Sequence, residues 1–399
     1  MEVLRLRDFR LLFGAQAASH LGDRMVGIAL AFAVLALHGS ATDVGIVLAV
    51  RMLPTVATLL VGGVVADRMS RRAVMVAADV SRVLTQGAMA ALLITGAAEI
   101  WMLALLAGAT GAATGFFNPA SVGLLPAIVP PERLQEANGV RATAMSGGEI
   151  AGPAIAGVLI AAVGAGWALA FDAATFAVSA AFLARLRPPA RAPRAATTFI
   201  ADLRAGWGVF RSITWVWTFV VAAAFGNLLW GAWSTLGPVV ADRELGGAAA
   251  WGTVLAAMGV GALLGSVGAI RARPRRPLVF ANLAYALFAF PLAFLAMEAP
   301  VALLAVGALF GGAAMMLGNT VWESTLQRHI PTDSLSRVSA YDWFGSLAFN
   351  PLGLAIWGPI AVLIGISASL WVVTALMVAT SAALLAVPAI RALREPQPA

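Results

Sequence analysis

The chain has 399 residues, of which 61% are hydrophobic and only 11% are charged, with three His and no Cys. Soluble domains carry about a quarter charged residues, so this chain lacks the polar side chains to cover a soluble globule of its size. Together with a mean hydropathy of +0.89, the composition excludes a soluble enzyme or a DNA-binding protein and indicates an integral membrane protein. A sequence without Cys also excludes disulfides, thiolate nucleophiles and thiolate metal sites.

Twelve apolar runs are long enough to cross a bilayer, because a hydrocarbon core of about 30 Å needs about 20 helical residues. They lie near residues 11–37, 43–66, 73–96, 100–124, 138–163, 165–184, 213–240, 248–270, 277–297, 300–325, 338–364 and 367–389. The runs are continuous rather than alternating, which favours helices over strands. The first run is too long for a cleaved signal segment, so we expect the mature protein to retain it.

The basic residues predict the orientation in the membrane. All 26 are Arg, and with a cytoplasmic N-terminus 21 of them fall in cytoplasmic segments, whereas only Arg243 falls outside. The positive-inside rule therefore places both termini in the cytoplasm. Arginine clusters that separate apolar runs are a topology signal rather than a phosphate-binding face, so we expect no nucleic-acid partner.

The longest polar stretch, residues 185–211, divides the chain into halves. It predicts a six-helix bundle over 1–186, a cytoplasmic linker over 187–212 and a second six-helix bundle over 213–399. Within the linker, one apolar stripe predicts a short amphipathic helix on the membrane surface, formed by Phe199, Leu203, Trp207 and Phe210.

The two halves resemble a repeat with an offset of 201 residues. This offset pairs Asn118 with Asn319, Pro130 with Pro331, Leu134 with Leu335, Gly152 with Gly353, and Gly157 with Gly358. Such a repeat implies two pseudo-symmetric bundles related by an axis along the membrane normal, as in a two-domain transporter.

The loop after the second run reads Gly63-Val-Val-Ala-Asp67-Arg68-Met-Ser70-Arg71-Arg72. It resembles the loop signature of the major facilitator superfamily, with Ser70 where that pattern has Gly. The resemblance implies that Asp67, Arg68 and Arg71 form a gate that latches the two bundles on the cytoplasmic face. The alternative is that these arginines only anchor the loop. The second half has Ala269 in place of the acid, so the latch is asymmetric.

Small residues recur in the fifth run, at Gly139, Gly148, Gly152, Pro153 and Gly157. Their spacing resembles the antiporter motif of exporters in this superfamily. Small residues allow a neighbouring backbone to approach closely, and Pro bends a membrane helix. We expect the partner surface on the eighth run, at Gly261 and Gly265. A packing face without a role in transport is the alternative.

Three further stretches carry a finer resemblance: residues 6–13, Ser19-His-Leu-Gly-Asp23 and Phe117-Asn-Pro-Ala120. Together with the loop at Asp67, they resemble the bacterial branch that contains macrolide-efflux proteins and enterobactin exporters. The resemblance extends over nearly the whole chain.

Ionisable residues inside the runs are candidate coupling residues, since each costs at least about 2.5–3.5 kcal/mol at a helix centre. A proton carrier must be an acid that is neutral when buried and charged when hydrated or paired. Asp23 and Glu149 fit by depth, and Arg51 is the cation that could replace the proton. The alternative is a permanent Asp–Arg pair that only fixes helix packing, which is our interpretation of Asp79 with Arg82.

Substrate contacts are expected from apolar and aromatic side chains of the seventh and tenth runs, which suit bulky hydrophobic ligands. The predicted cavity residues are Asn118, Phe225, Asn227, Trp230, Trp233, Met315, Asn319 and Trp322. Ordinary packing or an aromatic belt at the membrane interface would explain the tryptophans equally well. The sequence has no phosphate-binding loop, since it has no Lys to complete one, so we expect no cofactor and a proton gradient as the energy source.

These patterns predict an all-α membrane protein of the major facilitator fold that exports a bulky, largely hydrophobic small molecule as a monomer in the lipid bilayer. A drug, a macrolide or a siderophore would fit, and a lipid-like metabolite is an alternative. An importer or uniporter of the same fold, a membrane enzyme and a non-transporting receptor are the competing classes. Coupling to Na⁺ instead of H⁺ also stays open, because carboxylates serve both ions.

Overall fold

The computed structural model describes residues 2–187, 207, 208 and 210–394. Within these ranges the chain is helical and contains no strand. Twelve of the helical spans are long and apolar enough to cross a membrane, which confirms the all-α prediction. Most of the predicted linker, including Phe199 and Leu203, lies outside the described residues.

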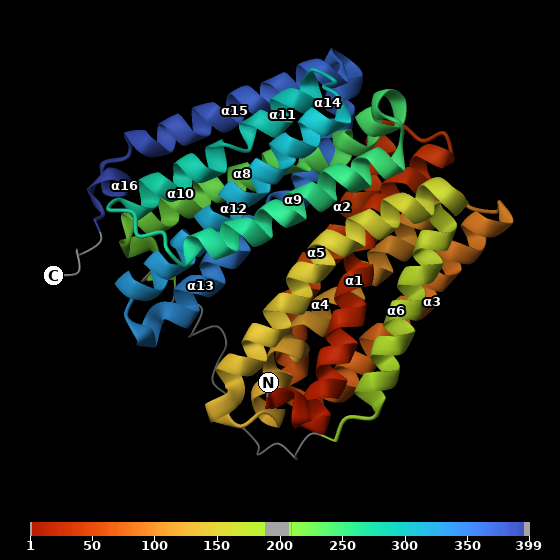
Figure 1. Ribbon diagram of the computed structural model, residues 1–399, viewed down its shortest axis with the longest axis horizontal. Helices are drawn as coiled ribbons and strands as arrows, with labels where there is room; N and C mark the ends of the chain where they lie inside the picture. The colour runs from red at the N-terminus through yellow and green to blue at the C-terminus, as the bar shows by residue number, and fades with distance from the viewer. Residues whose placement is uncertain (1, 188–206, 209, 395–399) are drawn as a thin grey trace. The chain divides into compact units, whose positions relative to one another are not determined.

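The first half forms six long helices (Figure 1). Their bounds are α1 Arg7–Ala36, α2 Ala41–Arg68, α3 Arg71–Thr95, α4 Ile100–Ile128, α5 Leu134–Val163 and α6 Ala165–Ala184. The N-terminal end of α2 is fixed by side-chain hydrogen bonds. The Ser40 hydroxyl accepts a hydrogen bond from the Asp43 N–H, and the Asp43 carboxylate accepts one from the Ser40 N–H, a capping box that starts the helix.

The second half is divided into more helices. They are α8 Thr214–Val240, α9 Ala248–Ala269, α10 Pro277–Ala286, α11 Ala289–Ala296, α12 Val301–His329, α13 Thr332–Leu347, α14 Asn350–Ile364, α15 Ile366–Ala386 and α16 Pro388–Ala392. A single π-helical turn, Ala241–Leu245, follows α8.

Two of the predicted spans consist of two consecutive helices each. The ninth run is divided between α10 and α11, and the eleventh between α13 and α14. Pro291 lies in the first turn of α11 and Pro351 in the first turn of α14. Because proline has no N–H to donate to the preceding turn, the helix is interrupted just before each one.

The chain forms two compact units. The N-unit contains Met1–Ala192 and Ser234–Ala256, and the C-unit contains Pro193–Trp233 and Ala257–Ala399. Thus the end of α8 and the start of α9 belong to the N-unit, although the predicted boundaries place them in the second bundle. The spans on either side of the predicted linker otherwise fall into different units.

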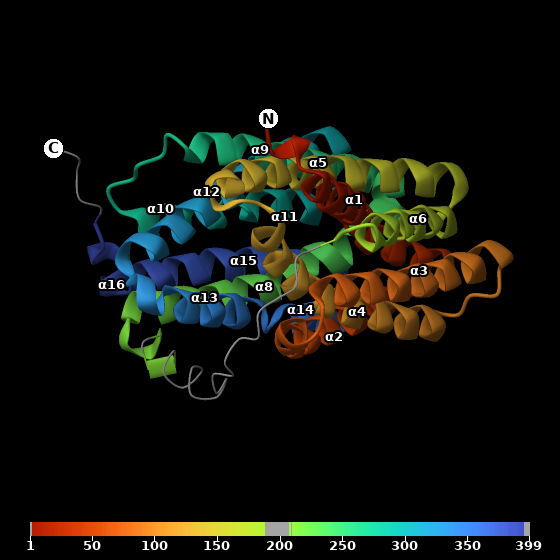
Figure 2. The same cartoon turned by 90° about the horizontal axis from the view of Figure 1, so that it is seen from below.

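In the N-unit, α1 packs on α5 and α6, α3 packs on α4 and α6, and α2 packs on α4 (Figures 1 and 2). Glycines of α4 allow the closest approach. A Cβ atom on Gly111 would collide with the carbonyl group of Arg51, and the Thr55 hydroxyl donates to the Gly111 carbonyl at 3.0 Å. Small residues and hydroxyl groups thus hold α2 against α4, as is usual where lipid replaces water.

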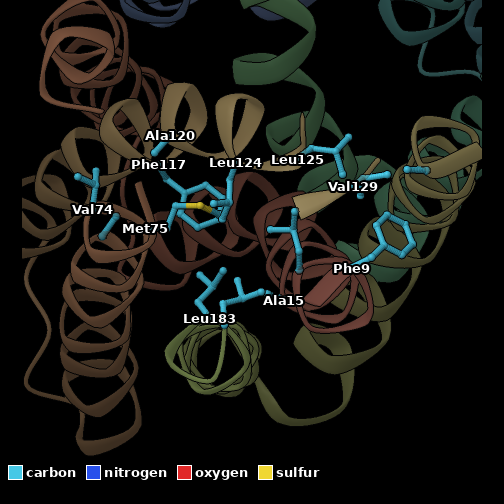
Figure 3. Packing of buried hydrophobic residues seen from close by; sticks show 14 of the residues in the cluster. Phe9, Ala15, Val74, Met75, Phe117, Ala120, Leu124, Leu125, Val129 and Leu183 are labelled. Atoms are coloured by element: carbon cyan, nitrogen blue, oxygen red, sulfur yellow. The ribbon is translucent and has the colours of Figure 1, made fainter. Parts of the chain in front are cut away.

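Apolar side chains fill the space between α1, α3, α4 and α6 at one end of the N-unit (Figure 3). Phe9, Met75, Phe117, Leu124 and Leu183 are all buried there. Since lipid tails are as apolar as these side chains, close packing rather than exclusion from water stabilises this cluster.

In the C-unit, α10 packs on α12 and α15, and α11 packs on α12 and α15 (Figure 1). The repeat predicted from the sequence reappears in the helix ends. Ile100 and Val301 begin α4 and α12, and Ile128 and His329 end them, 201 residues apart in both cases. Ala165 and Ile366 begin α6 and α15 with the same offset.

Candidate functional site

The predicted gate lies where α2 gives way to α3. Asp67 and Arg68 end α2, but their side chains lie outside the part that the structure describes. Ser70, which replaces the Gly of the family pattern, caps α3, because its hydroxyl accepts from the Ala73 N–H at 3.4 Å. Arg71 is the first residue of α3. The adjacent Arg72 donates to the carbonyls of Leu183 and Ala184 and so fixes the end of α6.

The glycines of the predicted antiporter motif bring α5 close to α1. A Cβ atom on Gly148 would lie 2.7 Å from the imidazole ring of His20. On Gly152 it would lie 2.6 Å from Cβ of Arg24 and 3.0 Å from the carbonyl oxygen of Leu21. At Gly152 the close neighbours include the backbone, so a larger residue would force α1 and α5 apart, whereas at Gly148 a larger residue would have to displace the His20 ring.

Further along α5 the motif contacts α9 within the N-unit. A Cβ atom on Gly157 would lie 2.8 Å from the carbonyl oxygen of Ala248, and one on Gly252 would lie 2.7 Å from the carbonyl oxygen of Pro153. Gly139, by contrast, has open space around it. The eighth span therefore does contact the motif, but through Gly252 rather than through the expected Gly261 and Gly265.

The expected partners Gly261 and Gly265 pack elsewhere. In the C-unit both lie against α12, where a Cβ atom would collide with the carbonyl groups of Leu309 and Ala313. The sequence showed that the eighth span has a small-residue face, but it could not assign that face to a neighbour.

The motif also brings three ionisable side chains together between α1 and α5. The Glu149 carboxylate lies 2.8 Å from Nη2 of Arg24 and 3.6 Å from Nε2 of His20. The Glu149 side chain is 39% exposed and that of Arg24 is 45% exposed. The acid is thus paired but accessible. The sequence analysis did not include His20 among the candidate coupling residues, although it lies one helical turn before Arg24 and so on the same face of α1.

The second predicted acid, Asp23, faces α2. Its Oδ1 lies 3.7 Å from Nη2 of Arg51, with both side chains about a quarter exposed. Asp172 of α6 interacts electrostatically with both Asp23 and Arg51, and its carboxylate accepts a hydrogen bond of 2.5 Å from Gln86. Arg51 is therefore shared between two acids, one partly exposed and one buried.

A third ion pair, Asp79 with Arg82 on α3, is fully buried, with a separation of 3.3 Å. The Ser179 hydroxyl donates to Asp79 at 2.6 Å, and the guanidinium lies over the rings of Phe117 and Phe176. Side chains of α4 and α6 thus contact this ion pair of α3, so it links three helices. Such contacts are those of a structural pair, as we interpreted it.

A cavity of about 330 Å³ lies inside the C-unit, between α8, α10, α12, α13 and α15. Five of the residues predicted for the substrate cavity line it, namely Asn227, Trp230, Met315, Asn319 and Trp322. Three do not. Trp233 is buried against Phe288, Phe225 is exposed on α8, and Asn118 is exposed on α4 of the other unit.

The wall of this cavity is mainly aromatic. Trp322 stacks on Phe219 with ring centroids 4.2 Å apart, and Trp230 packs on Phe288 at 4.8 Å. Two polar lining residues bind each other, because the Tyr285 hydroxyl donates to the Asn319 side chain at 2.5 Å. A cavity of this size with a few polar groups on apolar walls suits a small-molecule ligand.

Among the lining residues that the sequence analysis did not assign to the cavity are Tyr285, Glu323, Asp342 and Trp343. Glu323 follows Trp322 and lies four residues after Asn319, so helical spacing alone places it near the predicted cavity face. Asp342 is an acid within the eleventh apolar run, which was its only signal in the sequence, and Trp343 had none.

The twelve candidate spans and the partly open cavity are the architecture of a multi-pass membrane transporter. The model of the Major Facilitator Superfamily matches residues 12–347, so the chain belongs to this family of transporters. It is a transporter by family, not an enzyme.

Related proteins are similar over most of the chain. The multidrug efflux pump Tap of Mycolicibacterium fortuitum is 29% identical over 389 residues, which cover 90% of each chain. Tap of Mycobacterium tuberculosis is 27% identical over 96% of this chain and 94% of its own. The uncharacterized MFS-type transporter YfiS of Bacillus subtilis is 30% identical, but the match spans 43% of this chain and 40% of YfiS.

Solved structures share the fold at low identity. A peptide transporter POT variant in complex with sulfate superposes with a TM-score of 0.78 at 12% identity, covering 96% of this chain and 94% of that one. A bacterial homologue of the human lysosomal transporter Spinster gives a TM-score of 0.74 at 14% identity, with 96% of each chain covered. These similarities establish the fold alone.

Proposed function

We propose that the protein exports bulky, largely hydrophobic small molecules in exchange for protons, by alternating access in a bacterial inner membrane. The observation that carries this proposal is the aromatic cavity of the C-unit, which would hold an apolar ligand of drug size. Similarity to the Tap multidrug efflux pumps over nine-tenths of both chains supports drugs as the substrate class.

In this proposal Glu149 and Asp23 carry the proton. Each is a partly exposed acid beside an arginine, Arg24 for Glu149 and Arg51 for Asp23. A proton that binds the carboxylate removes its charge and releases the arginine, so the attraction between the two helices weakens. Because the pairs join α1 to α5 and α1 to α2, a change in protonation acts on helix contacts directly.

The gate and the glycine motif would convert this local change into movement. We assign the latch between the two bundles to Asp67, Arg68 and Arg71, on the cytoplasmic side. The close contacts of Gly148 and Gly152 with α1 make the spacing between α1 and α5 depend on the size of every side chain between them. With both termini cytoplasmic, the protein would need no cofactor, since the proton gradient supplies the energy, and it would work as a monomer.

Import or uniport by the same fold is the alternative. Solved relatives by fold include a nucleoside transporter, NupG, with a TM-score of 0.74 and 14% identity, so the fold does not decide the direction. Export is favoured by the small-residue pattern of α5 and by the Tap relatives.

A susceptibility and accumulation screen in an efflux-deficient bacterial host tests the proposal. Cells that produce the protein should accumulate less of at least one hydrophobic drug than cells that carry the empty vector. A protonophore should abolish the difference. If every compound accumulates equally, or if the difference survives the protonophore, proton-driven export is the wrong function.

A further inference from the structure

The cavity of the C-unit carries negative charge that the proposed function leaves unused. Two acids, Glu323 of α12 and Asp342 of α13, are among the residues that line it, and none of the lining residues that the structure describes is basic. Asp342 is buried, at 9% exposed, whereas Glu323 is exposed. The two carboxylates are close enough to influence each other electrostatically.

Neither acid has a cationic partner among the described side chains. This distinguishes them from three acids of the N-unit, Asp23, Asp79 and Glu149, each of which lies within 4 Å of an arginine. A charged group taken out of water is stabilised by an opposite charge, by hydrogen bonds or by a bound ion. In this cavity Asp342 has hydrogen bonds and Glu323 has exposure to solvent, but the described lining has no basic side chain, so a cationic ligand would supply the opposite charge that the cavity lacks.

The Asp342 carboxylate is held in place by its neighbours. Its Oδ2 accepts a hydrogen bond from the Trp322 indole N–H at 3.1 Å, and the Ser346 hydroxyl lies 3.5 Å from Oδ1. One strong contact orients the group, and the weaker one on Oδ1 leaves that oxygen able to bind a further donor. The same tryptophan that forms the cavity wall therefore also positions the acid.

The aromatic walls suit a cation as well. Trp322, Trp230 and Tyr285 line the cavity, and Trp343 at its edge is 62% exposed. The face of an aromatic ring carries negative electrostatic potential and attracts cations, most strongly when the cation is poorly hydrated. A delocalised or quaternary cation with a hydrophobic body would contact both the rings and the carboxylates, whereas an anion would be repelled by the carboxylates.

We infer that the cavity of the C-unit binds hydrophobic organic cations, with Asp342 and Glu323 as the residues that select positive charge. This inference rests on the proposed function, because it names the charge class of the exported molecule. It separates amine-type and other cationic drugs from neutral compounds and from anionic siderophores, all of which the sequence left open.

Binding of two ions of equal size and opposite charge tests the inference directly. Tetraphenylphosphonium and tetraphenylborate have the same shape and nearly the same apolar surface, so a difference in affinity reports the charge of the site. With the purified full-length protein in neutral detergent, equilibrium dialysis corrected for micelle partitioning should give at least about tenfold tighter binding of the phosphonium. Equal affinity, or a preference for the borate, would overturn the inference.

Variants locate the selectivity. Asp342→Asn and Glu323→Gln should each weaken phosphonium binding several-fold and leave borate binding the same or stronger, and the double variant should lose the preference. Glu244→Gln, an exposed acid outside the cavity, is the matched control and should bind as the parent protein does. If the double variant retains the preference, the charge selection lies elsewhere and the assignment is wrong. The parent protein alone answers the charge question if a variant fails to fold.

The inference and the proposed function fail in different ways. A protein that exports neutral drugs under a proton gradient, but shows no preference for the phosphonium, keeps the proposed function and loses the inference. If the protein binds the phosphonium selectively but moves no compound against a gradient, the cation site is supported and the proposed export function is wrong.

Discussion

The two compact units use acidic side chains differently. In the N-unit, Glu149, Asp79 and Asp23 lie 2.8, 3.3 and 3.7 Å from an arginine. In the C-unit, Glu323 and Asp342 face an aromatic cavity, with no basic residue among its described lining. The two halves of one helical repeat therefore differ: these three acids of the N-unit lie in ion pairs, whereas the two acids at the C-unit cavity have no basic side chain in its described lining. Under our proposals, the ion pairs hold or couple helices and the cavity acids bind the ligand.

The repeat itself sharpens this contrast. Gly152 and its counterpart Gly353, 201 residues later, both lie against the backbone or Cβ of a neighbouring helix, α1 for Gly152 and α8 for Gly353. The same offset takes Glu149 to Asn350. The close packing is thus present at both equivalent glycines, whereas at the positions of Glu149 and Asn350 only the N-unit residue is an acid.

The largest expected effect concerns the buried pair of the N-unit. Arg82→Met removes the partner of Asp79, which is fully buried, and leaves a charge without compensation. We expect a loss of about 3–5 kcal/mol in stability, because breaking one side of a buried pair costs more than replacing both sides. Thermal unfolding in detergent, followed by tryptophan fluorescence, measures the change.

The double variant Asp79→Asn with Arg82→Met is the control for that prediction. It removes both charges and should recover much of the lost stability. A double variant that is as unstable as Arg82→Met would mean that the guanidinium acts through its contacts with Phe117 and Phe176, not through its charge.

A smaller effect should separate two glycines of one motif. Gly152→Ala forces a methyl group to within 2.6 Å of Cβ of Arg24, whereas Gly139→Ala enters open space. We expect the first to cost about 1–3 kcal/mol by overpacking. The second should be neutral or stabilise by about 0.5–1 kcal/mol, because Ala loses less backbone entropy in a helix.

Melting temperatures and gradient-driven flux of both glycine variants provide the measurement. Equal behaviour of the two would show that the motif does not act through close contact between α5 and α1.

The smallest predicted effect is at the edge of the C-unit cavity. Trp343→Ala removes an aromatic face that is 62% exposed and should weaken phosphonium binding about two- to fivefold. Trp101→Ala, at a residue that is 60% exposed in the N-unit, is the matched control and should change nothing. Dialysis with labelled phosphonium measures both. Equal losses would point to nonspecific effects of removing tryptophan.

Most of the fold could be predicted from the sequence. Long continuous apolar runs dictate membrane helices, because every backbone polar group must be satisfied within lipid. The spacing of Gly148 and Gly152 likewise indicated a close helix contact, which the structure has between α5 and α1. Apolar runs and glycine spacing are patterns within one helix, so they can be identified from the sequence alone.

The partners of each side chain could not be predicted in the same way. The sequence predicted that Arg51 lies near Asp23. It did not predict that Asp172 also interacts electrostatically with Arg51, because that depends on how α6 packs. Asp342 lines the cavity through the packing of α13 in the C-unit, which the sequence alone does not specify. Trp233 shares a helix with Trp230 yet is buried away from the cavity, since one helical turn does not specify which neighbour covers each face.

The division of tasks between the units is tested most directly by phosphonium transport in proteoliposomes, with equilibrium exchange and pH-driven accumulation measured on the same preparations. Glu149→Gln should retain exchange and lose pH-driven accumulation, because the cavity is intact and one of the two proton carriers on which coupling depends is absent. Asp342→Asn should reduce both several-fold at low phosphonium concentration, because it weakens binding in the cavity. If Glu149→Gln still concentrates the phosphonium under a pH gradient, or if Asp342→Asn exchanges it normally, the two tasks are not divided between the units in this way.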